Sequence, residues 1–315
     1  MLDVRRLRLL RDLAHLGTIA AVAKAHTYTP SAVSQQLATL EREAGVPLLE
    51  RTGRRVTLTP AAVRLVRHAE AVLAALERAV ADLAAEAAGL SGPLRIGAFP
   101  SAVRTLLPAA LVRLGRDHPG LELMVRELDP AEMPDALRER TVDVGLTHDY
   151  DLAPDNPEPG LDAVPLLDET VYLAVPEAWR EVAKDPVRAA RDSAWIMGSA
   201  GTLCHTVALR VCRAAGFKPR IRHHADDFAT VLALVAAGQG VSLVPHLAAT
   251  QVPGNVRLMP LTARRRTRIA YRTGAAAHPA VAATVAAVRA VAGSYLDHDS
   301  VIPPRRSISE VSPAG

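Results

Sequence analysis

Aromatic residues and lysine are scarce in this sequence of 315 residues. Phe, Trp and Tyr together make up 3% of the chain, and lysine occurs only at Lys24, Lys184 and Lys218. The core must therefore consist mainly of Leu, Val and Ala, and arginine supplies nearly all of the positive charge. No stretch reaches the roughly 18 uncharged apolar residues that a membrane helix needs, and the N-terminus lacks the pattern of an export signal. These absences predict a globular cytoplasmic protein with no membrane partner.

Cysteine is also rare, with Cys204 and Cys212 alone. They stand eight residues apart on a predicted helix, where their Cα atoms would be about 12 Å apart, too far for a disulfide. Reduced thiols fit the cytoplasm. Two roles stay open for Cys204. It is either a redox sensor at a helix start, where thiolate is favoured, or a small buried packing residue, which is the favoured interpretation.

Motifs for metal binding and catalysis are missing from the sequence as well. The histidines show no metal-ligand spacing, so neither a metal nor another cofactor is expected. No catalytic triad, phosphate-binding glycine loop or paired-carboxylate motif stands out. The sequence therefore predicts no enzyme and no catalytic residues.

Positive charge is concentrated at the beginning of the chain. Residues 1–60 carry nine Lys and Arg against five Asp and Glu, and this excess equals the formal net charge of the whole chain, +4. Arginine abundance alone is weak evidence for nucleic acid binding, because codon bias produces it too. A basic segment on an otherwise neutral body nevertheless indicates a polyanionic partner at that end.

The basic segment has the pattern of a winged helix-turn-helix. A helical period over residues 2–16 is followed by a short helix over residues 19–25. A third helix begins at Thr29-Pro30, with a capping hydroxyl and a proline in the first turn, and runs to about Ala44. Its outer face is polar, which suits a helix in the DNA major groove. Two short arginine-bearing strands around a Gly turn follow and predict a wing.

Residues 10–62 resemble the LysR-type transcriptional regulators. The matching blocks are Gly17-Thr18-Ile19-Ala20-Ala21-Val22-Ala23, Thr29-Pro30-Ser31-Ala32-Val33-Ser34-Gln35-Gln36-Leu37, Leu40-Glu41, Gly45-Val46-Pro47-Leu48-Leu49-Glu50-Arg51 and Leu58-Thr59-Pro60-Ala61-Ala62. The family usually has Phe where Leu49 stands and Gly where Ala62 stands. The resemblance implies an α/β protein with an N-terminal winged helix-turn-helix in residues 1–59, a long linker helix, and a C-terminal two-lobed domain like the type 2 periplasmic binding proteins.

The matched positions give candidate contacts to double-stranded DNA. Helix residues are expected to face the bases, and wing arginines are expected to bind phosphate. The predicted DNA-binding residues are Thr29, Pro30, Ser31, Ser34, Gln35, Arg51, Arg54 and Arg55. For the hydroxyls of Thr29 and Ser31, an alternative role as plain helix caps stays open.

Residues 60–90 are predicted to form a dimerisation helix. Apolar residues step along it by four and three, at Leu65, Ala69, Val72, Leu76, Ala79 and Leu83. This heptad seam suits pairing with a second copy, because a helix of about 28 residues would be roughly 42 Å long. The alternative is a helix that packs on its own chain. The family resemblance favours a homodimer and implies a homotetramer through a second surface.

Residues 94–295 alternate between strand and helix patterns, which predicts parallel α/β sheets. The expected strands are Leu94–Phe99, Leu121–Leu128, Val142–Thr147, Val171–Val175, Trp195–Met197, Ile221–His223, Val241–Val244 and Ile269–Arg272. Two lobes are expected, with chain crossings near Asp168–Thr170 and Thr273–Ala276. The segments 94–97, 142–146 and 235–245 resemble the effector domain of the same family. Residues 296–315 read as a disordered tail.

Effectors of such sheets bind beyond the carboxyl ends of the strands. Two loops there start helices and offer hydroxyl and N–H groups, which favours an anionic small molecule. The predicted effector-binding residues are Pro100, Ser101, Ala102, Thr147, His148, Ser199, Thr202 and Phe228. The alternative is that these residues are plain caps and turns.

These patterns together predict a sequence-specific DNA-binding transcriptional regulator, controlled by a small-molecule effector bound between two α/β lobes. The alternative is a cytoplasmic solute-binding protein without direct gene control. The basic N-terminal segment argues against that alternative, because solute binding does not require it.

Overall fold

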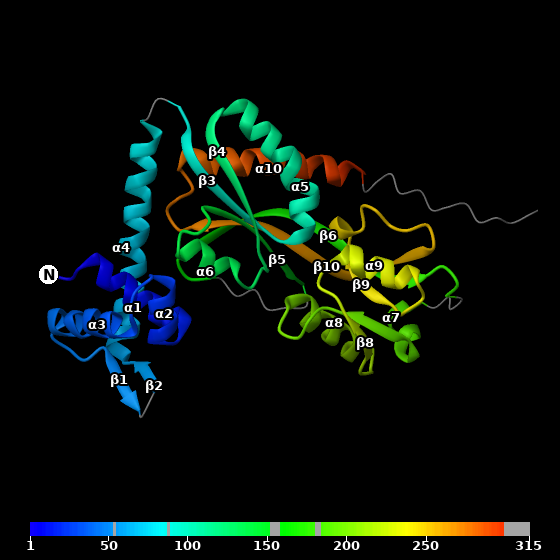
Figure 1. Ribbon diagram of the computed structural model, residues 1–315, viewed down its shortest axis with the longest axis horizontal. Coiled ribbons are helices and arrows are strands. Elements are labelled where there is room, and N and C mark those ends of the chain that lie inside the picture. The colour runs from blue at the N-terminus through cyan, green and yellow to red at the C-terminus, as the bar shows by residue number, and fades with distance from the viewer. Residues whose placement is uncertain (53–54, 87–88, 152–157, 180–183, 299–315) are drawn as a thin grey trace, which may run out of the picture.

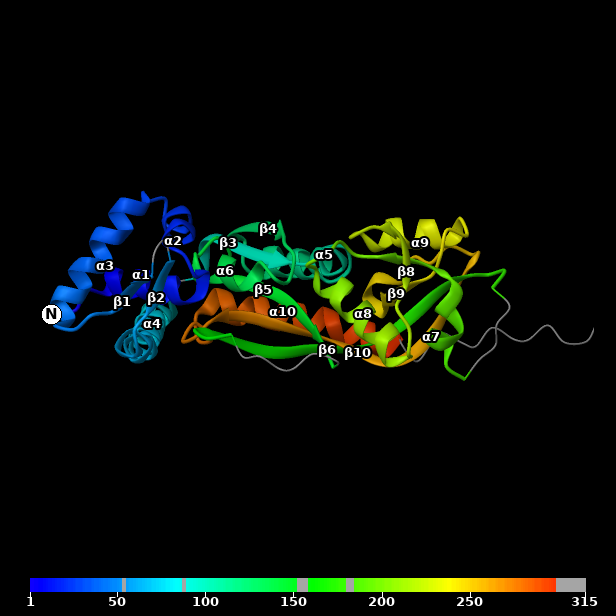
Figure 2. The ribbon, with the colours of Figure 1, turned by 90° about the horizontal axis from the view of Figure 1, so that it is seen from below.

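The computed structural model describes residues 1–52, 55–86, 89–151, 158–179 and 184–298. A helical head, a long helix and a two-lobed α/β region follow one another along the chain (Figure 1). Figure 2 shows the two lobes arranged end to end, with the head at one end of the molecule. Within the described ranges, no helix is both long enough and apolar enough to cross a membrane.

The head consists of three helices and a hairpin. Its elements are α1 (Val4–Leu16), α2 (Ile19–Ala25), α3 (Pro30–Ala44), β1 (Leu49–Thr52) and β2 (Arg55–Leu58). The side chains of Asp3, Thr18 and Thr29 cap the three helices by accepting backbone N–H groups. Gly17 and Gly45 end α1 and α3 in the left-handed conformation, which glycine adopts without strain. Leucine and valine side chains from all three helices form one closed core.

The linker helix α4 (Pro60–Ala85) leaves the head after Thr59, whose hydroxyl accepts the N–H of Ala62. Its first turns belong to the head, because Ala62 and Ala69 are buried in the head core and Leu65 packs against it. The predicted seam is therefore wrong at Leu65 and Ala69, which face their own chain. The remaining seam positions lie further along the helix, where the head no longer covers them.

The two lobes contain the remaining elements. They are β3 (Ser91–Ala98), α5 (Pro100–Asp117), β4 (Gly120–Glu127), α6 (Met133–Arg138), β5 (Val144–Tyr150), β6 (Leu161–Pro176), α7 (Pro186–Ala189), β7 (Ala194–Met197), α8 (Leu203–Ala214), β8 (Arg220–His224), α9 (Phe228–Ala236), β9 (Ser242–Pro245), β10 (Val256–Arg272) and α10 (Pro279–His298), with two short 3-10 turns. Lobe 1 is built from β3 to β5 with α5, α6 and α10. Lobe 2 is built from β7 to β9 with α7, α8 and α9.

One six-stranded sheet runs through both lobes, in the order β4-β3-β5-β10-β6-β9. The prediction of parallel sheets is correct for β3 with β4 and β5, and for β7 with β8. It is wrong for β10 and β6, which pair antiparallel with each other and with their neighbours. The sheet is mixed because these two long strands carry the chain between the lobes in opposite directions.

The second crossing between the lobes lies earlier than predicted. The first half of β10 pairs with β6 in lobe 2, and residues from Arg265 onward pair with β5 in lobe 1. The register shifts between Pro260 and Arg264, so the chain crosses there rather than near Thr273–Ala276. The first crossing lies inside β6, whose two ends belong to different lobes.

The C-terminal helix α10 continues to His298, so the predicted tail begins three residues too early. No glycine or proline stands between Ser294 and Val301 to end the helix. The rest of the predicted tail, 299–315, lies outside the described residues. Helices α10 and α5 cover one face of the lobe 1 sheet, and α6 packs on the opposite face.

Candidate functional site

The outer face of α3 carries the predicted base-contacting residues. Pro30, Ser31 and Gln35 are exposed, and Ser34 is half-buried beside them. Thr29 caps the helix by accepting the N–H of Ala32 at 3.2 Å, and its hydroxyl lies 2.9 Å from that of Ser31. The Thr29 hydroxyl thus caps the helix, the Ser31 hydroxyl contacts it without capping, and both residues remain open to solvent.

The predicted wing arginines fall on the hairpin. Arg51 lies in β1 opposite Val56, and Arg55 lies in β2 opposite Thr52. Arg54 lies outside the described residues. The hairpin stands at the free end of the head, next to α3 and away from the lobes (Figure 1). The α3 helix and the hairpin therefore lie at the same end of the head.

The second half of α4 exposes an apolar stripe. Val72, Leu76, Val80 and Leu83 are 39%, 43%, 48% and 75% exposed. Side chains at these spacings share one side of a helix. We call these four residues the linker stripe. Its residues are not covered by the head or by lobe 1, so the stripe is open to a second copy of the chain.

A different side of α4 contacts lobe 1. Glu77 is 9% exposed and pairs with two arginines of lobe 1, Arg140 and Arg272. Gly274 lies directly against the helix, because a Cβ atom at this position would collide with the carbonyl oxygen of Ala74. The linker helix is thus fixed to the end of β10 by ion pairs and a close backbone approach.

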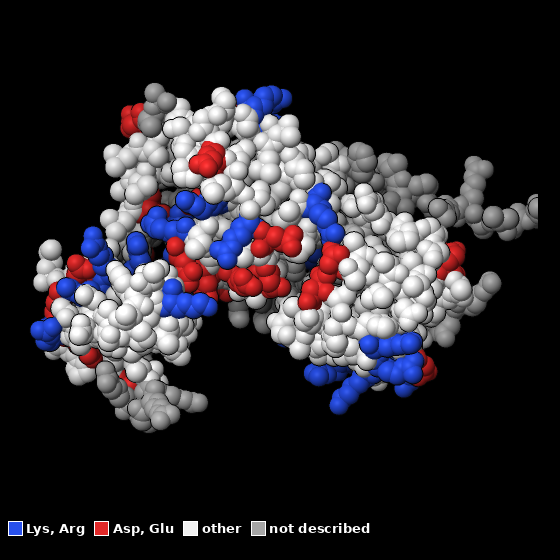
Figure 3. Space-filling model, in the orientation of Figure 1, with Lys and Arg blue, Asp and Glu red and all other residues white. Residues whose placement is uncertain are grey.

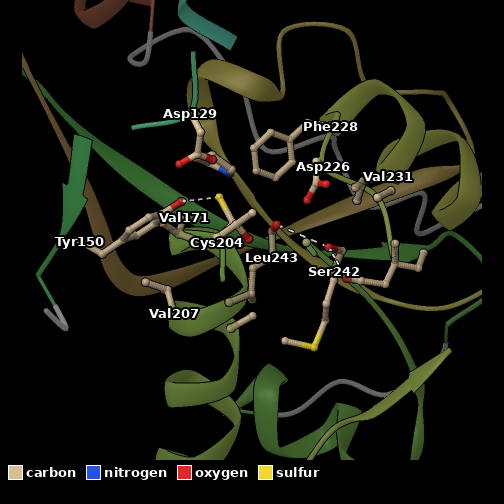
Figure 4. A pocket seen from close by; sticks show the side chains of 17 residues that line it. Asp129, Tyr150, Val171, Cys204, Val207, Asp226, Phe228, Val231, Ser242 and Leu243 are labelled. Atoms are coloured by element: carbon tan, nitrogen blue, oxygen red, sulfur yellow. Dashed lines mark hydrogen bonds between the residues drawn. The ribbon is translucent and has the colours of Figure 1, made fainter. Parts of the chain in front are cut away.

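A cleft of about 290 Å³ separates the lobes. We call it the interlobe cleft, and its lining residues are Phe99, Pro100, Ser101, Glu127, Leu128, Asp129, Pro130, His148, Thr202, Cys204, Asp226, Phe228 and Arg265. A smaller cavity in lobe 2, of about 60 Å³, shares five of these residues, Asp129, Thr202, Cys204, Asp226 and Phe228. Figure 4 shows Asp129, Asp226 and Phe228 around this cavity. Arg104 of lobe 1 also pairs with Asp227 of lobe 2 at 2.5 Å, although neither residue lines the cleft.

Five of the eight predicted effector-binding residues line the interlobe cleft: Pro100, Ser101, His148, Thr202 and Phe228. The other three line neither this cleft nor the smaller cavity. Ala102 is fully buried in the core of lobe 1, because it points from α5 toward the sheet. Thr147 points away from its neighbour His148, because strand side chains alternate. Ser199 instead binds Asp226 through its N–H and its hydroxyl, at 2.7 and 2.6 Å.

The floor of the interlobe cleft contains a buried arginine that the sequence analysis missed. Arg265 of β10 is fully buried and pairs with Glu169 of β6 at 2.6 Å. Its Nη2 lies 3.4 Å from the Ser101 hydroxyl, and its guanidinium lies 5.0 Å from the centre of the Phe99 ring. Its Nη1 is buried and has no hydrogen-bond partner among the described residues. A buried hydrogen-bond donor without an acceptor costs free energy. A ligand acceptor that binds Nη1 would therefore bind favourably.

Burial favours the neutral forms of three titratable groups near this arginine, His148, Tyr150 and Cys204. Burial, with a smaller effect of Arg265, lowers the pKa of His148 well below its usual range. Burial raises the pKa of Tyr150 well above its usual value, and the Tyr150 hydroxyl lies 3.7 Å from Cys204 Sγ. Burial also raises the pKa of the Cys204 thiol. A charged ligand group at the floor would therefore interact mainly with Arg265 and Glu169.

Both cysteines are expected to react slowly with thiol reagents. Burial raises the pKa of Cys204, and it raises the pKa of Cys212 to about 12, so little thiolate exists at neutral pH. The rate of modification of the folded chain by an aromatic disulfide should be at least about tenfold below that of the unfolded chain at pH 7. The rate for the folded chain should rise with pH, because the raised pKa values mean that the thiols lose their protons only at a higher pH than usual. Equal rates for folded and unfolded chain would contradict this account.

Within the described residues, no group of three or more His, Cys, Asp and Glu side chains is placed to hold a metal ion. The histidines near the cleft act in other ways. His205 and His224 each place Nδ1 within hydrogen-bond distance of the Gly198 carbonyl oxygen, at 2.9 and 3.2 Å. They thereby stabilise the loop that precedes α8.

Two family models match the chain. Residues 4–63 match the bacterial regulatory helix-turn-helix protein of the lysR family. Residues 87–293 match the LysR substrate binding domain. A protein from Streptomyces viridosporus named "Probable hydrogen peroxide-inducible genes activator" is 34% identical over 292 residues, which cover 87% of this chain and 92% of the relative.

Solved structures show the same fold over most of the chain. A full-length OxyR variant from Pseudomonas aeruginosa aligns with a TM-score of 0.59 and 23% identity, covering 92% of this chain and 95% of that one. Full-length CbnR in complex with its target DNA aligns with a TM-score of 0.52 and 24% identity, covering 92% and 100%. The two family models account for the head and for both lobes, which favours a regulator over a solute-binding protein. The chain therefore belongs to the LysR family of bacterial transcriptional regulators.

Proposed function

We propose that this regulator reads DNA with α3 and the β1–β2 hairpin, as a dimer paired through the linker stripe. Thr29, Pro30, Ser31, Ser34 and Gln35 approach the bases, and the arginines at 51, 54 and 55 bind phosphate. Dimerisation places two α3 helices on one duplex, which suits a site of two half-sites. The observation that carries the proposal is the solvent-exposed polar face of α3 beside a hairpin with basic residues.

We also propose that a small-molecule effector binds in the interlobe cleft and controls DNA binding. Strand β10 carries Arg265 at the cleft and Arg272 at the contact with Glu77 of the linker helix. Arg272 lies seven residues after Arg265 along the strand, a distance of about 23 Å. A ligand that changes how the lobes close can therefore shift the end of β10 and the angle of α4. This one strand links effector binding to the position of the head.

A second surface supports assembly beyond the dimer. Val112 of α5 is 74% exposed, and Met124 and Val125 of the edge strand β4 are 43% and 41% exposed. An unpaired edge strand beside exposed apolar side chains favours association with another copy. We infer a tetramer that uses this surface and the linker stripe. The protein is proposed to act in the cytoplasm, where its DNA lies, and to have no enzymatic activity.

The DNA-reading proposal is tested by two different substitutions. Arg51→Ala should weaken binding to all duplexes and reduce the slope of log affinity against log salt by about 0.9, the value for one lost phosphate contact. Gln35→Ala should lower the preference for the specific site by about 1–3 kcal/mol and leave the salt slope unchanged. Fluorescence anisotropy with the chain's own upstream DNA and a scrambled duplex measures both quantities.

The matched control is Arg220→Ala, which removes an exposed arginine from β8 in lobe 2. It should change neither affinity nor salt slope, because β8 lies far from the head (Figure 1). If Arg51→Ala and Gln35→Ala behave like this control, α3 and the hairpin do not form the DNA interface.

A further inference from the structure

We propose that the effector carries both a protonated amine and a hydrogen-bond acceptor, as an amino acid does. The acceptor binds Arg265 at the floor of the interlobe cleft, and the ammonium group binds between Asp129 and Asp226 at its wall. This inference rests on the proposed function, in which the effector occupies this cleft. It adds the chemical class of the effector.

The first line of evidence is the incomplete hydrogen bonding of Arg265. Its Nε binds Glu169, and its Nη2 lies 3.4 Å from the Ser101 hydroxyl. Its Nη1 has no partner among the described residues, although it is fully buried. The arginine lines the interlobe cleft, so a ligand there can reach it. A carboxylate or carbonyl oxygen would complete its hydrogen bonds.

The second line of evidence is the excess of negative charge around the cleft. Three carboxylates line it, those of Glu127, Asp129 and Asp226. Among the described lining residues Arg265 is the one cation, and Glu169 already balances its charge. In Figure 3, Asp and Glu side chains lie along the lower side of lobe 1 and at its junction with lobe 2, with several Lys and Arg side chains beside them.

Asp226 is held in place and ionised. The hydroxyl and the N–H of Ser199 donate to its two carboxylate oxygens, and these hydrogen bonds lower its pKa. Each oxygen keeps a second lone pair for a ligand. Asp129 is fixed by the N–H of Ala131, which donates to its Oδ1 at 2.8 Å. Both side chains line both cavities, and Figure 4 shows them around the same hollow as Phe228.

Other ligand classes satisfy only part of this arrangement. A simple anion would bind Arg265 but lie beside three uncompensated carboxylates. A simple amine would leave Nη1 of Arg265 without an acceptor. A metal ion lacks a suitable ligand group among the described residues. The rings of Phe99 and Phe228 provide apolar contacts, and a cleft of about 290 Å³ suits a molecule of roughly amino acid size. The effector inferred here keeps the anionic group that the sequence predicts and carries an ammonium group as well.

The test uses the full chain and a small-molecule extract of the cells that contain its gene. The extract is passed over a cation exchanger at acidic pH, which retains amines and lets other metabolites through. Each fraction is added to the protein, and thermal unfolding and affinity for the upstream DNA are measured. The retained fraction is expected to raise the unfolding temperature and change DNA affinity, and the unretained fraction is expected to do neither.

Two variants test where the amine binds within the cleft. Asp129→Asn and Asp226→Asn should each weaken the response to the retained fraction at least about tenfold, measured as the dilution that gives half the maximal effect. Glu122→Gln is the matched control, because it removes one exposed carboxylate from β4 outside the cleft. It should respond like the wild type.

The outcomes separate this inference from the proposed function. A response to the unretained fraction alone would overturn the amine and leave effector control intact. A response to the retained fraction that both aspartate variants keep would overturn the assigned position of the amine. No response to the whole extract or to either fraction would contradict effector control and, with it, this inference.

Discussion

Replacing Arg265 by methionine is expected to destabilise the two-lobed region by about 3–5 kcal/mol, the usual cost of removing one partner from a buried ion pair. Arg265 is fully buried, and its partner Glu169 is 3% exposed. Methionine fills most of the space, so the main effect is an unpaired carboxylate in the interior. For a region of this size, the unfolding temperature should fall by roughly 10 °C. Thermal unfolding followed by circular dichroism measures the change.

Two further variants test why Arg265→Met is destabilising. Arg264→Ala removes the neighbouring arginine, whose side chain is 40% exposed and pairs with Asp168. It should cost at most about 1 kcal/mol, because solvent screens an exposed pair. Adding Glu169→Gln to Arg265→Met should restore part of the lost stability, since the buried charge disappears. A double variant as unstable as Arg265→Met alone would show that the unpaired charge is not the cause.

Replacing Leu76 by aspartate is expected to convert the assembly into species that no longer pair through the linker stripe. Leu76 lies in the middle of the stripe, and each apolar side chain buried there contributes about 1.5–3 kcal/mol. An aspartate in the same place adds the cost of burying a charge, once from each copy. Loss of the second head should weaken DNA binding by about 100-fold or more. Analytical ultracentrifugation and DNA titration measure the two effects.

Ala71→Asp is the matched control for this change. Ala71 is also exposed on α4, but it lies about 100° around the helix from Val72. The control should keep the wild-type assembly and DNA affinity. If Leu76→Asp sediments like wild type and binds DNA equally well, the linker stripe does not mediate pairing.

The head was largely predictable because its signals are local. Caps such as Thr18 and Thr29, left-handed glycines at the helix ends and a period of 3.6 each act within a few residues. The linker seam was predicted less well. Its apolar period continues without a break, so the sequence alone could not show that Leu65 and Ala69 pack on the head while Leu76 remains exposed.

The interlobe cleft was only partly predictable. The first-turn proline Pro100 and the cap residue Thr202 mark helix starts that the sequence reveals, and both residues line the cleft. Arg265 stands within Arg264-Arg265-Arg266, a run that reads as a solvated strand. The alternation of buried and exposed residues along a strand could have identified Arg265. Ala263, Thr267 and Ile269 lie an even number of residues from it and are also buried. Its partner Glu169 lies 96 residues away, so no local signal could pair them.

The most direct test of the account is a footprint of the purified full-length chain on the DNA upstream of its own gene. We expect two protected half-sites on one face of the duplex, with centres separated by a whole number of turns of about 10 base pairs. We also expect an affinity that falls steeply with salt and exceeds that for scrambled DNA by at least about 1,000-fold. Uniform protection, or equal affinity for both duplexes, would contradict the central claim that α3 reads DNA sequence from paired copies of this chain.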